Sequence, residues 1–324
     1  MQQALATLAE TLRASAGLAG KADIATVAAR LGLSGAGAVP VGDDCAALPD
    51  GDGYLLLAIE GFMNGFVAGD PWFAGWCGVM VNASDIAAMG GRPLAVVDAV
   101  WADGEAGAAP VLDGLAAASS AFGIPVVGGH TNIRNDRGQL SVAILGRAKR
   151  LLTSFDARPG QRLVAAVDLR GRYRAPFDNW EAATDAPASR LRGDLELLPQ
   201  IAEAGLSGAG KDVSQGGIVG TAAMLAECSQ VGIAIDLAAV PRPDGVDLAR
   251  WLLTFPSFGY LLSAAPQDVP ALIARFAARG IAAADIGAVT ADQRVTLSDS
   301  SAQETIWDFT QRPLLGCAPR GAAA

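Results

Sequence analysis

The strongest constraint on the fold is a repeated alternation between segments with strand periodicity and segments with helical periodicity. From residue 54 to residue 148, apolar runs of strand length alternate with longer apolar segments of helical length. Segments that alternate in this way pack as layers of helix and sheet. The expected order is strand, helix, strand, helix, strand, strand, at residues 54–61, 71–90, 93–101, 110–122, 124–129 and 139–148.

The second half of the chain repeats this mixture after a turn-rich joint at residues 154–160. Strand patterns and helical patterns recur there, at residues 162–169, 195–205, 216–230, 232–237, 258–264, 269–280, 281–289 and 294–298. Residues 171–192 have no clear period and are expected to form an irregular, mobile insertion. We therefore predict an α+β fold with a helical segment at residues 1–37, a first domain at residues 38–153 and a second domain at residues 154–324.

Composition limits the classes of function. The 324 residues are 51% hydrophobic and 18% charged, which is typical of a compact globular protein. A net charge of −9 and the lack of a basic run predict that the protein does not bind nucleic acid. The sequence has no stretch typical of a signal peptide or a membrane span, and its four cysteines are widely spread, so we predict a cytoplasmic protein with no membrane partner.

Four acidic residues in the first domain are candidate metal ligands. Asp43 and Asp44 follow a Gly-rich stretch, and adjacent carboxylates repel one another unless water or a cation lies between them. Glu60 ends an apolar strand, and Asp85 lies in an apolar helix, where a buried carboxylate needs a partner. Taken alone, each site has a simpler explanation. The Asp43–Asp44 pair could lie in a solvated loop, Glu60 could be an ordinary strand-end charge, and Asp85 could form a hydrogen bond in the core. Carboxylate oxygens in this number suit a hard cation such as Mg²⁺.

Paired glycines occur at the predicted end of the strand at residues 124–129. Gly128 and Gly129 allow backbone amides to approach an anion closely, and Thr131 adds a hydroxyl group. His130 is the only histidine of the chain, so it cannot belong to a histidine metal triad. We interpret it as a polar contact and not as a general base.

A second Gly-containing motif opens the predicted helix at residues 216–230. Ser214 is the expected N-cap of this helix, and Gly216 and Gly217 expose backbone amides that suit an anion. Asp212 comes just before this motif. Ordinary helix capping explains Ser214 but does not explain why Asp212 and two glycines accompany it.

In this order, the motifs resemble those of the aminoimidazole ribonucleotide (AIR) synthetase superfamily, over about residues 38–290. Its members include thiamine-monophosphate kinase, selenophosphate synthetase and the hydrogenase-maturation carbamoyl dehydratase. The segment Gly42-Asp43-Asp44, the helix from Asn82 to Asp85, the Gly-Gly-x-Thr strand end at 128–131 and the 212–217 motif carry the resemblance. The chain is most similar to the group called AIR synthase-related proteins.

The resemblance implies a two-domain AIR synthetase-like fold and a homodimer, in which the N-terminal α/β domain forms the dimer barrel and ATP binds at the interface. It implies an ATP- and Mg²⁺-dependent enzyme, a phosphotransferase or ligase that phosphorylates or activates an oxygen of a small-molecule substrate. By matched position, it makes Asp212 the catalytic residue on the substrate side. Its implied metal ligands are Asp43, Asp44, Glu60 and Asp85, and its implied nucleotide or phosphate contacts are Asn82, Gly128, Gly129, His130, Thr131, Ser214, Gly216 and Gly217.

Departures from the family motifs leave three alternatives open. Asn64-Gly65-Phe66 and Gln215 replace residues of the thiamine-monophosphate kinase motifs, and the N-terminal catalytic loop of selenophosphate synthetase is missing. The alternatives are that kinase, a selenophosphate synthetase-like enzyme, and a nucleotide-binding scaffold without turnover. Cys317 weakly resembles the carboxyl-terminal cysteine of the carbamoyl dehydratase.

Overall fold

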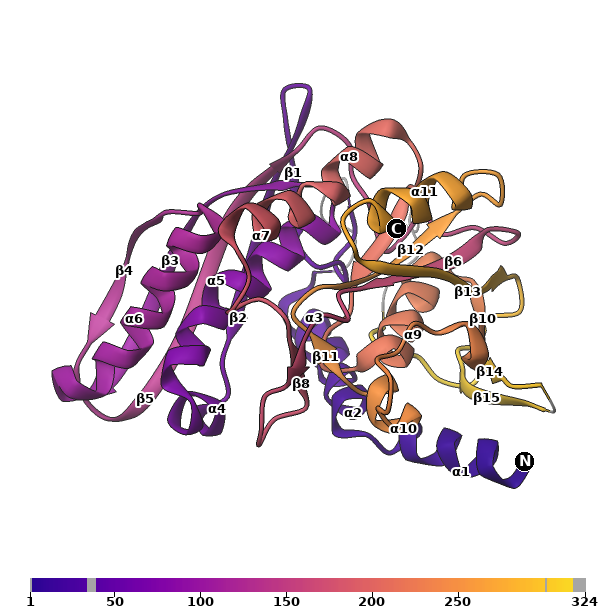
Figure 1. Ribbon diagram of the computed structural model, residues 1–324, viewed down its shortest axis with the longest axis horizontal. Coiled ribbons are helices and arrows are strands. Elements are labelled where there is room, and N and C mark those ends of the chain that lie inside the picture. Colours follow the sequence, from indigo (N-terminus) through magenta and orange to yellow (C-terminus); the bar gives the residue numbers. More distant parts are fainter. Residues whose placement is uncertain (1, 34–38, 301, 317–324) are drawn as a thin grey trace. The chain divides into compact units, whose positions relative to one another are not determined.

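The computed structural model describes residues 2–33, 39–300 and 302–316 (Figure 1). Its contacts divide the chain into two compact units. Residues 44–151 and 185–200 form the five-stranded unit, and residues 2–33, 39–43, 152–184, 201–300 and 302–316 form the seven-stranded unit. Residues 2–33 and 39–43 therefore cluster with the second half of the chain. The domain boundaries predicted from the sequence remain a prediction.

The five-stranded unit is a sheet in the order β1-β2-β5-β3-β4, in which only β3 and β4 are parallel neighbours. The strands are β1 (Ala46–Asp50), β2 (Gly53–Gly61), β3 (Arg92–Asp103), β4 (Val126–Asn132) and β5 (Arg134–Ala148). The helices are α4 (Asn64–Gly69), α5 (Pro71–Ala88), α6 (Gly104–Phe122) and α7 (Ala188–Leu195). The sequence analysis missed β1, which is short and partly exposed.

Helices α5 and α6 pack on one face of this sheet (Figure 1). The side chain of Asp70 caps α5 by accepting a hydrogen bond from the Phe73 amide at 3.2 Å. The two helices approach closely where each has a glycine, because a Cβ atom on Gly75 or Gly114 would overlap a backbone carbonyl oxygen of the other helix. This close packing buries α5 almost completely and leaves no aqueous face for a charged side chain.

The other face of the sheet, which we call the open sheet face, exposes large apolar side chains. Its members are Leu48 (53% exposed), Leu57 (49%), Ile59 (69%), Val97 (43%) and Leu145 (38%). The cross-strand pairs Leu48–Leu55, Leu57–Leu145, Ile59–Ala143 and Val97–Ala143 place them on one face, since Leu55, Leu57 and Ile59 alternate along β2. A contiguous apolar face of this kind is typical of a protein–protein interface.

The seven-stranded unit contains a mixed sheet in the order β15-β14-β10-β13-β6-β12-β9. Its strands are β6 (Arg162–Val167), β9 (Ala209–Asp212), β10 (Gly232–Asp236), β12 (Gly259–Ala264), β13 (Ala282–Thr290), β14 (Arg294–Ser298) and β15 (Gln303–Asp308). Its helices are α1 (Gln2–Arg13), α2 (Ala16–Lys21), α3 (Asp23–Leu31), α9 (Gly217–Ser229), the 3₁₀ helix η1 (Leu237–Ala239), α10 (Leu248–Leu252) and α11 (Val269–Ala277). Helix α8 (Leu197–Ala204) begins in the five-stranded unit and ends in the seven-stranded unit. Helix α9 packs on β9, β10, β12 and β14.

The expectation of an irregular insertion at residues 171–192 was wrong. This region contains β7 (Arg172–Tyr173), β8 (Asn179–Glu181) and α7, and the two strands join β11 (Phe255–Pro256) in a small sheet. Trp180 is buried, with its ring edge-on to Tyr173 at 5.2 Å and to Trp251 at 5.4 Å. Burial of these aromatic rings orders the segment, although its sequence has no strand or helix period.

Candidate metal and nucleotide site

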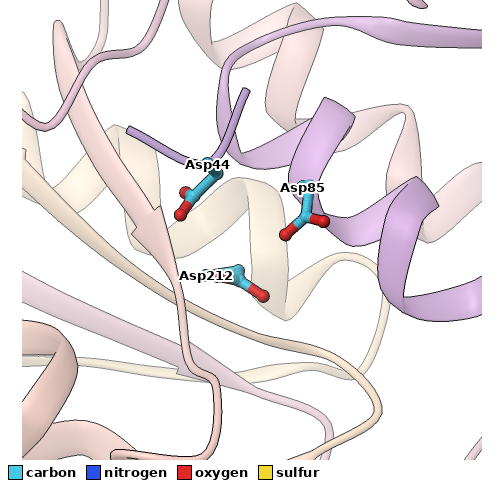
Figure 2. A group of neighbouring side chains, drawn as sticks. All are labelled: Asp44, Asp85 and Asp212. Carbon is cyan, nitrogen blue, oxygen red and sulfur yellow. The ribbon is translucent and has the colours of Figure 1, made fainter. Parts of the chain in front are cut away.

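Asp44 and Asp85 form the centre of the candidate site in the five-stranded unit. The backbone amide of Cys45 donates a hydrogen bond to Met89 Sδ at 3.1 Å, which holds the segment before β1 at the end of α5. Asp85 lies one turn before Met89. The two aspartates have carboxylate oxygens within 4.8 Å of each other. Figure 2 shows Asp44 on the segment ahead of β1 and Asp85 on α5.

The surroundings of Asp85 suit a cation. Its side chain is only 6% exposed, and the helix residues around it are buried, including the polar Asn82 and Ser84. Two carboxylates at this separation repel one another, and a divalent cation between them removes both the repulsion and the cost of burial. An all-oxygen pair is the donor set that Mg²⁺ prefers. The residues present therefore fit the magnesium ion that the sequence analysis predicts.

Asp43 belongs to a different unit from Asp44, although the two are adjacent in sequence. In the seven-stranded unit, Asp43 Oδ2 accepts a hydrogen bond from the Ser154 amide at 2.9 Å. Its Oδ1 accepts one from the Ser154 hydroxyl at 2.7 Å. Asp43 thus fastens the segment before the first strand to residue 154. A metal-binding role for Asp43 remains a prediction.

Glu60 lies at the end of β2, on the sheet face that α5 covers. It pairs with Val142 on β5, Val142 pairs with Asp98 on β3, and Asp98 pairs with Gly129 on β4. Directly paired residues point to the same face, so Glu60, Asp98 and the predicted phosphate contact Gly129 share one row across the sheet. Glu60 does not belong to the close pair formed by Asp44 and Asp85. Its role as a ligand remains a prediction.

The sequence analysis missed Asp98, which is half-buried on β3. Burial raises the pKa of its carboxyl group above the ordinary value of 3.8. A Cβ atom on Gly129 would overlap Asp98 Oδ1, so only glycine fits beside this carboxylate. A single acid within the apolar run of residues 93–101 is the sequence signal that points to Asp98.

The glycines of the 128–131 motif lie within β4 and not after its end, because β4 continues to Asn132. Gly128, Gly129, His130 and Thr131 are all exposed on this edge strand, which pairs only with β3 among the strands of the sheet. A Cβ atom on Gly128 would meet nothing within 4 Å. The backbone here is open to a ligand, and the His130 ring lies 5.8 Å from the ring of Trp101.

Asn82 is fully buried on α5, one turn before Asp85. Its Nδ2 donates a hydrogen bond to the Gly78 carbonyl oxygen at 2.8 Å, whereas its Oδ1 has no donor within the described structure. Leaving a buried amide oxygen without a donor costs about 1–3 kcal/mol. This cost is a physical reason to expect a functional role for Asn82.

Asp212 ends β9 in the seven-stranded unit and is 3% exposed. The Thr221 hydroxyl donates a hydrogen bond to the Asp212 carbonyl oxygen at 3.3 Å, and the Val213 amide donates one to the Gly259 carbonyl oxygen at 2.8 Å. These bonds join the end of β9 to α9 and β12. Asp212, which Figure 2 also labels, belongs to a different unit from Asp44 and Asp85.

The predicted N-cap of α9 was wrong. The helix begins at Gly217, with Gly216 at the N-cap position and no side-chain cap. The carbonyl oxygen of Ser214 accepts a hydrogen bond from the Gly217 amide at 2.8 Å and so closes a turn ahead of the helix. Gly217 has a φ of 61°, which favours glycine, and this turn moves the helix start beyond the reach of Ser214 as a cap.

Cys317 lies outside the described residues. The cysteines that the structure describes, Cys45, Cys77 and Cys228, are buried thiols without a disulfide. Among the described helices, none has the length and apolar character needed to span a bilayer.

Two family models match the sequence. They are AIR synthase related protein, N-terminal domain, at residues 42–148, and AIR synthase related protein, C-terminal domain, at residues 178–300. An uncharacterized protein of Synechocystis sp. is 50% identical over 281 residues, which cover 86% of this chain and 87% of that protein. Thiamine-monophosphate kinase of Methanospirillum hungatei is 30% identical over 216 residues, which cover 64% of this chain and 72% of the kinase.

Solved structures share the fold. The complex of T. maritima PurL with ATP matches with a TM-score of 0.71 at 20% identity, over 86% of this chain and 47% of the PurL chain. The chain thus spans about half the length of that PurL. AaThiL complexed with AMPPCP and TMP matches with a TM-score of 0.65 at 20% identity, over 87% of this chain and 95% of that one. The predicted two-domain AIR synthetase-like fold of the α+β class is confirmed.

Proposed function

Because the chain belongs to the AIR synthase-related family, we propose that it binds ATP with Mg²⁺ and phosphorylates or activates an oxygen of a small-molecule substrate. The close pair of Asp44 and buried Asp85 is the observation that carries this proposal. Nucleotide complexes of two structural neighbours, PurL with ATP and AaThiL with AMPPCP, support it. When bound, Mg²⁺ would neutralise the charge of the triphosphate.

We assign the remaining roles by the chemistry of each residue. Asp44 and Asp85 hold the cation in the five-stranded unit. The exposed backbone at Gly128 and Gly129 receives phosphate oxygens, and Asn82 Oδ1 accepts a hydrogen bond from the bound nucleotide or its hydration shell. Asp212, at the end of β9, acts in the same reaction as the catalytic carboxylate on the side of the acceptor substrate.

Removal of the Asp85 charge tests the proposal directly. We expect Asp85→Asn to weaken Mg²⁺-dependent ATP binding by at least about tenfold, since an amide is a poorer ligand than a carboxylate. Calorimetric titration of ATP with and without Mg²⁺ measures this effect. Asp113→Asn is the matched control, because Asp113 is an exposed aspartate of the same unit. Equal Mg²⁺-dependent binding by Asp85→Asn and the wild type would contradict the metal assignment.

Turnover separates an enzyme from a scaffold. Incubation of the wild type with Mg²⁺, ATP and candidate acceptors should release ADP or phosphate. We expect Asp212→Asn to lower the rate of this release by about 100-fold, because a loss of this size is usual when a group that stabilises the transition state is removed. Tight ATP binding without turnover for any acceptor would favour the scaffold alternative.

Thiamine-monophosphate kinase is the second candidate, because one named relative with 30% identity is that enzyme. It predicts formation of thiamine diphosphate from thiamine monophosphate and ATP. Mass spectrometry of the reaction mixture decides the matter, and a mixture without the diphosphate eliminates this candidate. Asn64, Gly65 and Gln215, which depart from the kinase motifs, weigh against it.

We also propose a homodimer formed through the open sheet face. Five large apolar side chains on this face are between 38% and 69% exposed, and sheet faces of this kind are costly to leave in water. A second copy of the chain offers an apolar face of identical size and character, as a two-fold symmetric interface requires.

A further inference from the structure

An open cavity of about 350 Å³ lies at the last turn of α9. It is lined by a loop at residues 155–159, by residues 229–231 and by Ala291, all within the seven-stranded unit. Sites for small molecules have volumes of about 300–1,000 Å³. Asp212 precedes the first turn of α9, and this helix of 13 residues is about 20 Å long. The cavity is therefore separate from the Asp212 motif.

The loop that lines the cavity is held in place by hydrogen bonds. The Ala157 amide donates to the Ser229 hydroxyl oxygen at 3.0 Å, and the Ser229 hydroxyl donates to the Ser154 carbonyl oxygen at 2.7 Å. The Arg158 amide donates to Gln161 Oε1 at 2.8 Å. A binding surface that is ordered before the ligand arrives loses little conformational entropy when the ligand binds.

Two side chains of opposite charge line the cavity. Asp156 Oδ2 accepts a hydrogen bond from the Thr153 hydroxyl at 2.6 Å, which orients the carboxylate. Arg158 is exposed, and its guanidinium group forms no hydrogen bond or ion pair with any residue that the structure describes. Arg158 and Asp156 therefore do not pair with each other. A cavity that keeps these charges apart complements a ligand that carries both a carboxylate and an ammonium group.

The rest of the lining is mostly apolar. Ala157 is 4% exposed and Val231 is 3% exposed, and Pro159 and Ala291 add further apolar surface to the wall of the cavity. An aliphatic group that fills the cavity removes its own apolar surface and that of the wall from water, which favours binding. The lining thus suits a small zwitterion with an aliphatic body.

We propose that this cavity binds a free amino acid with an aliphatic side chain. Arg158 receives the carboxylate of this ligand, Asp156 receives its ammonium group, and the apolar wall receives its side chain. The site is distinct from the proposed metal and nucleotide site, so the inference does not rest on the proposed function.

The test uses L-leucine and two analogues that each lack one of its charges. 4-Methylpentanoate has no ammonium group, and 3-methylbutylamine has no carboxylate. In amide NMR titrations of the wild type, L-leucine should shift the resonances of Ala157, Gln230 and Val231, with a dissociation constant of about 1 mM or lower. Each analogue should bind about tenfold more weakly, because it loses a hydrogen bond between charged groups.

Two variants assign the charges to the residues. Arg158→Ala should bind L-leucine about tenfold more weakly than the wild type and no better than it binds 3-methylbutylamine. Arg275→Ala is the matched control, because Arg275 is an exposed arginine of α11 in the same unit. Asp156→Asn keeps an acceptor for the Thr153 hydroxyl but removes the charge, so it should bind L-leucine no better than 4-methylpentanoate.

The outcomes are separable from one another and from ATP binding. The inference is overturned if L-leucine at about 10 mM shifts none of the cavity resonances, or if Arg158→Ala binds it as well as Arg275→Ala does. Equal affinity of the wild type for L-leucine and 4-methylpentanoate would show an anion site and would also overturn it. If Asp156→Asn does not fold, Arg158→Ala still decides the matter, since its side chain lies at the surface.

Discussion

At the scale of single residues, the role of a carboxylate depends on how deeply it is buried and on which groups surround it. Asp85 is 6% exposed in an apolar helix, whereas Asp43 forms two hydrogen bonds with Ser154. Asp98 is half-buried beside Gly129, and burial raises the pKa of its carboxyl group. These three aspartates therefore differ in their surroundings, and Asp85 and Asp98 each support a different test.

Asp98 predicts a pH-dependent stability. Because its pKa is raised in the folded state, the folded protein binds this proton more tightly than the unfolded chain, and stability falls as the pH rises through the window above 3.8. We expect Asp98→Asn to melt at a higher temperature than the wild type at pH 7. The difference should shrink as the pH falls toward 4, where the wild-type carboxyl group becomes protonated.

Differential scanning calorimetry from pH 4 to pH 8 checks this prediction, with Asp113→Asn as the exposed control. A lower melting temperature for Asp98→Asn at pH 7 would mean that the folded protein stabilises the carboxylate as an anion, contrary to the direction of its pKa shift.

At the scale of elements, helix α9 connects the Asp212 loop to the end of the described chain within the seven-stranded unit. Its first turn follows the Asp212 loop and contacts α2. In its last turn, the buried carboxylate of Glu227 accepts hydrogen bonds from the amides of Leu314, Leu315 and Gly316, at 3.0, 2.6 and 3.0 Å. One helix thus positions the loop at its first turn and the 314–316 segment at its last.

Glu227 should therefore be a large contributor to stability. Glu227→Ala leaves three backbone amides without their acceptor, and we expect the free energy of unfolding to fall by about 3 kcal/mol. Urea denaturation measures the loss, and Glu10→Ala, at an exposed glutamate of α1, serves as the control. Glu227→Gln should lose less, because its amide oxygen still accepts a hydrogen bond. A change below 0.5 kcal/mol for the alanine variant, the range usual for surface substitutions, would contradict the role of the carboxylate.

At the scale of the whole molecule, the open sheet face governs the oligomeric state. Ile59 is its most exposed member, at 69%. We expect Ile59→Lys to convert a dimer into a monomer, because a buried ammonium group at the interface costs several kcal/mol. Sedimentation velocity measures the mass in solution. Leu112→Lys, at an exposed apolar position on α6, should remain dimeric. A monomeric wild type would overturn the proposed interface.

The sequence by itself determined the alternation of strands and helices and the motifs of the family. Apolar runs are local, so β2, α5 and β3 were predicted close to their observed bounds, and Asp85 stood out as an acid in an apolar helix. Asp44 was also predicted as a ligand, and its role is still a proposal.

Only the tertiary structure decided which residues meet. The row formed by Glu60, Asp98 and Gly129 depends on strand register, which pairs residues that are far apart in the sequence. The two hydrogen bonds of Asp43 with Ser154 join residues that are 111 positions apart in the sequence. Likewise, the order within residues 171–192 depends on Trp251, a distant residue that packs against Trp180. Local patterns carry no information about such partners, because burial and register are properties of the folded chain.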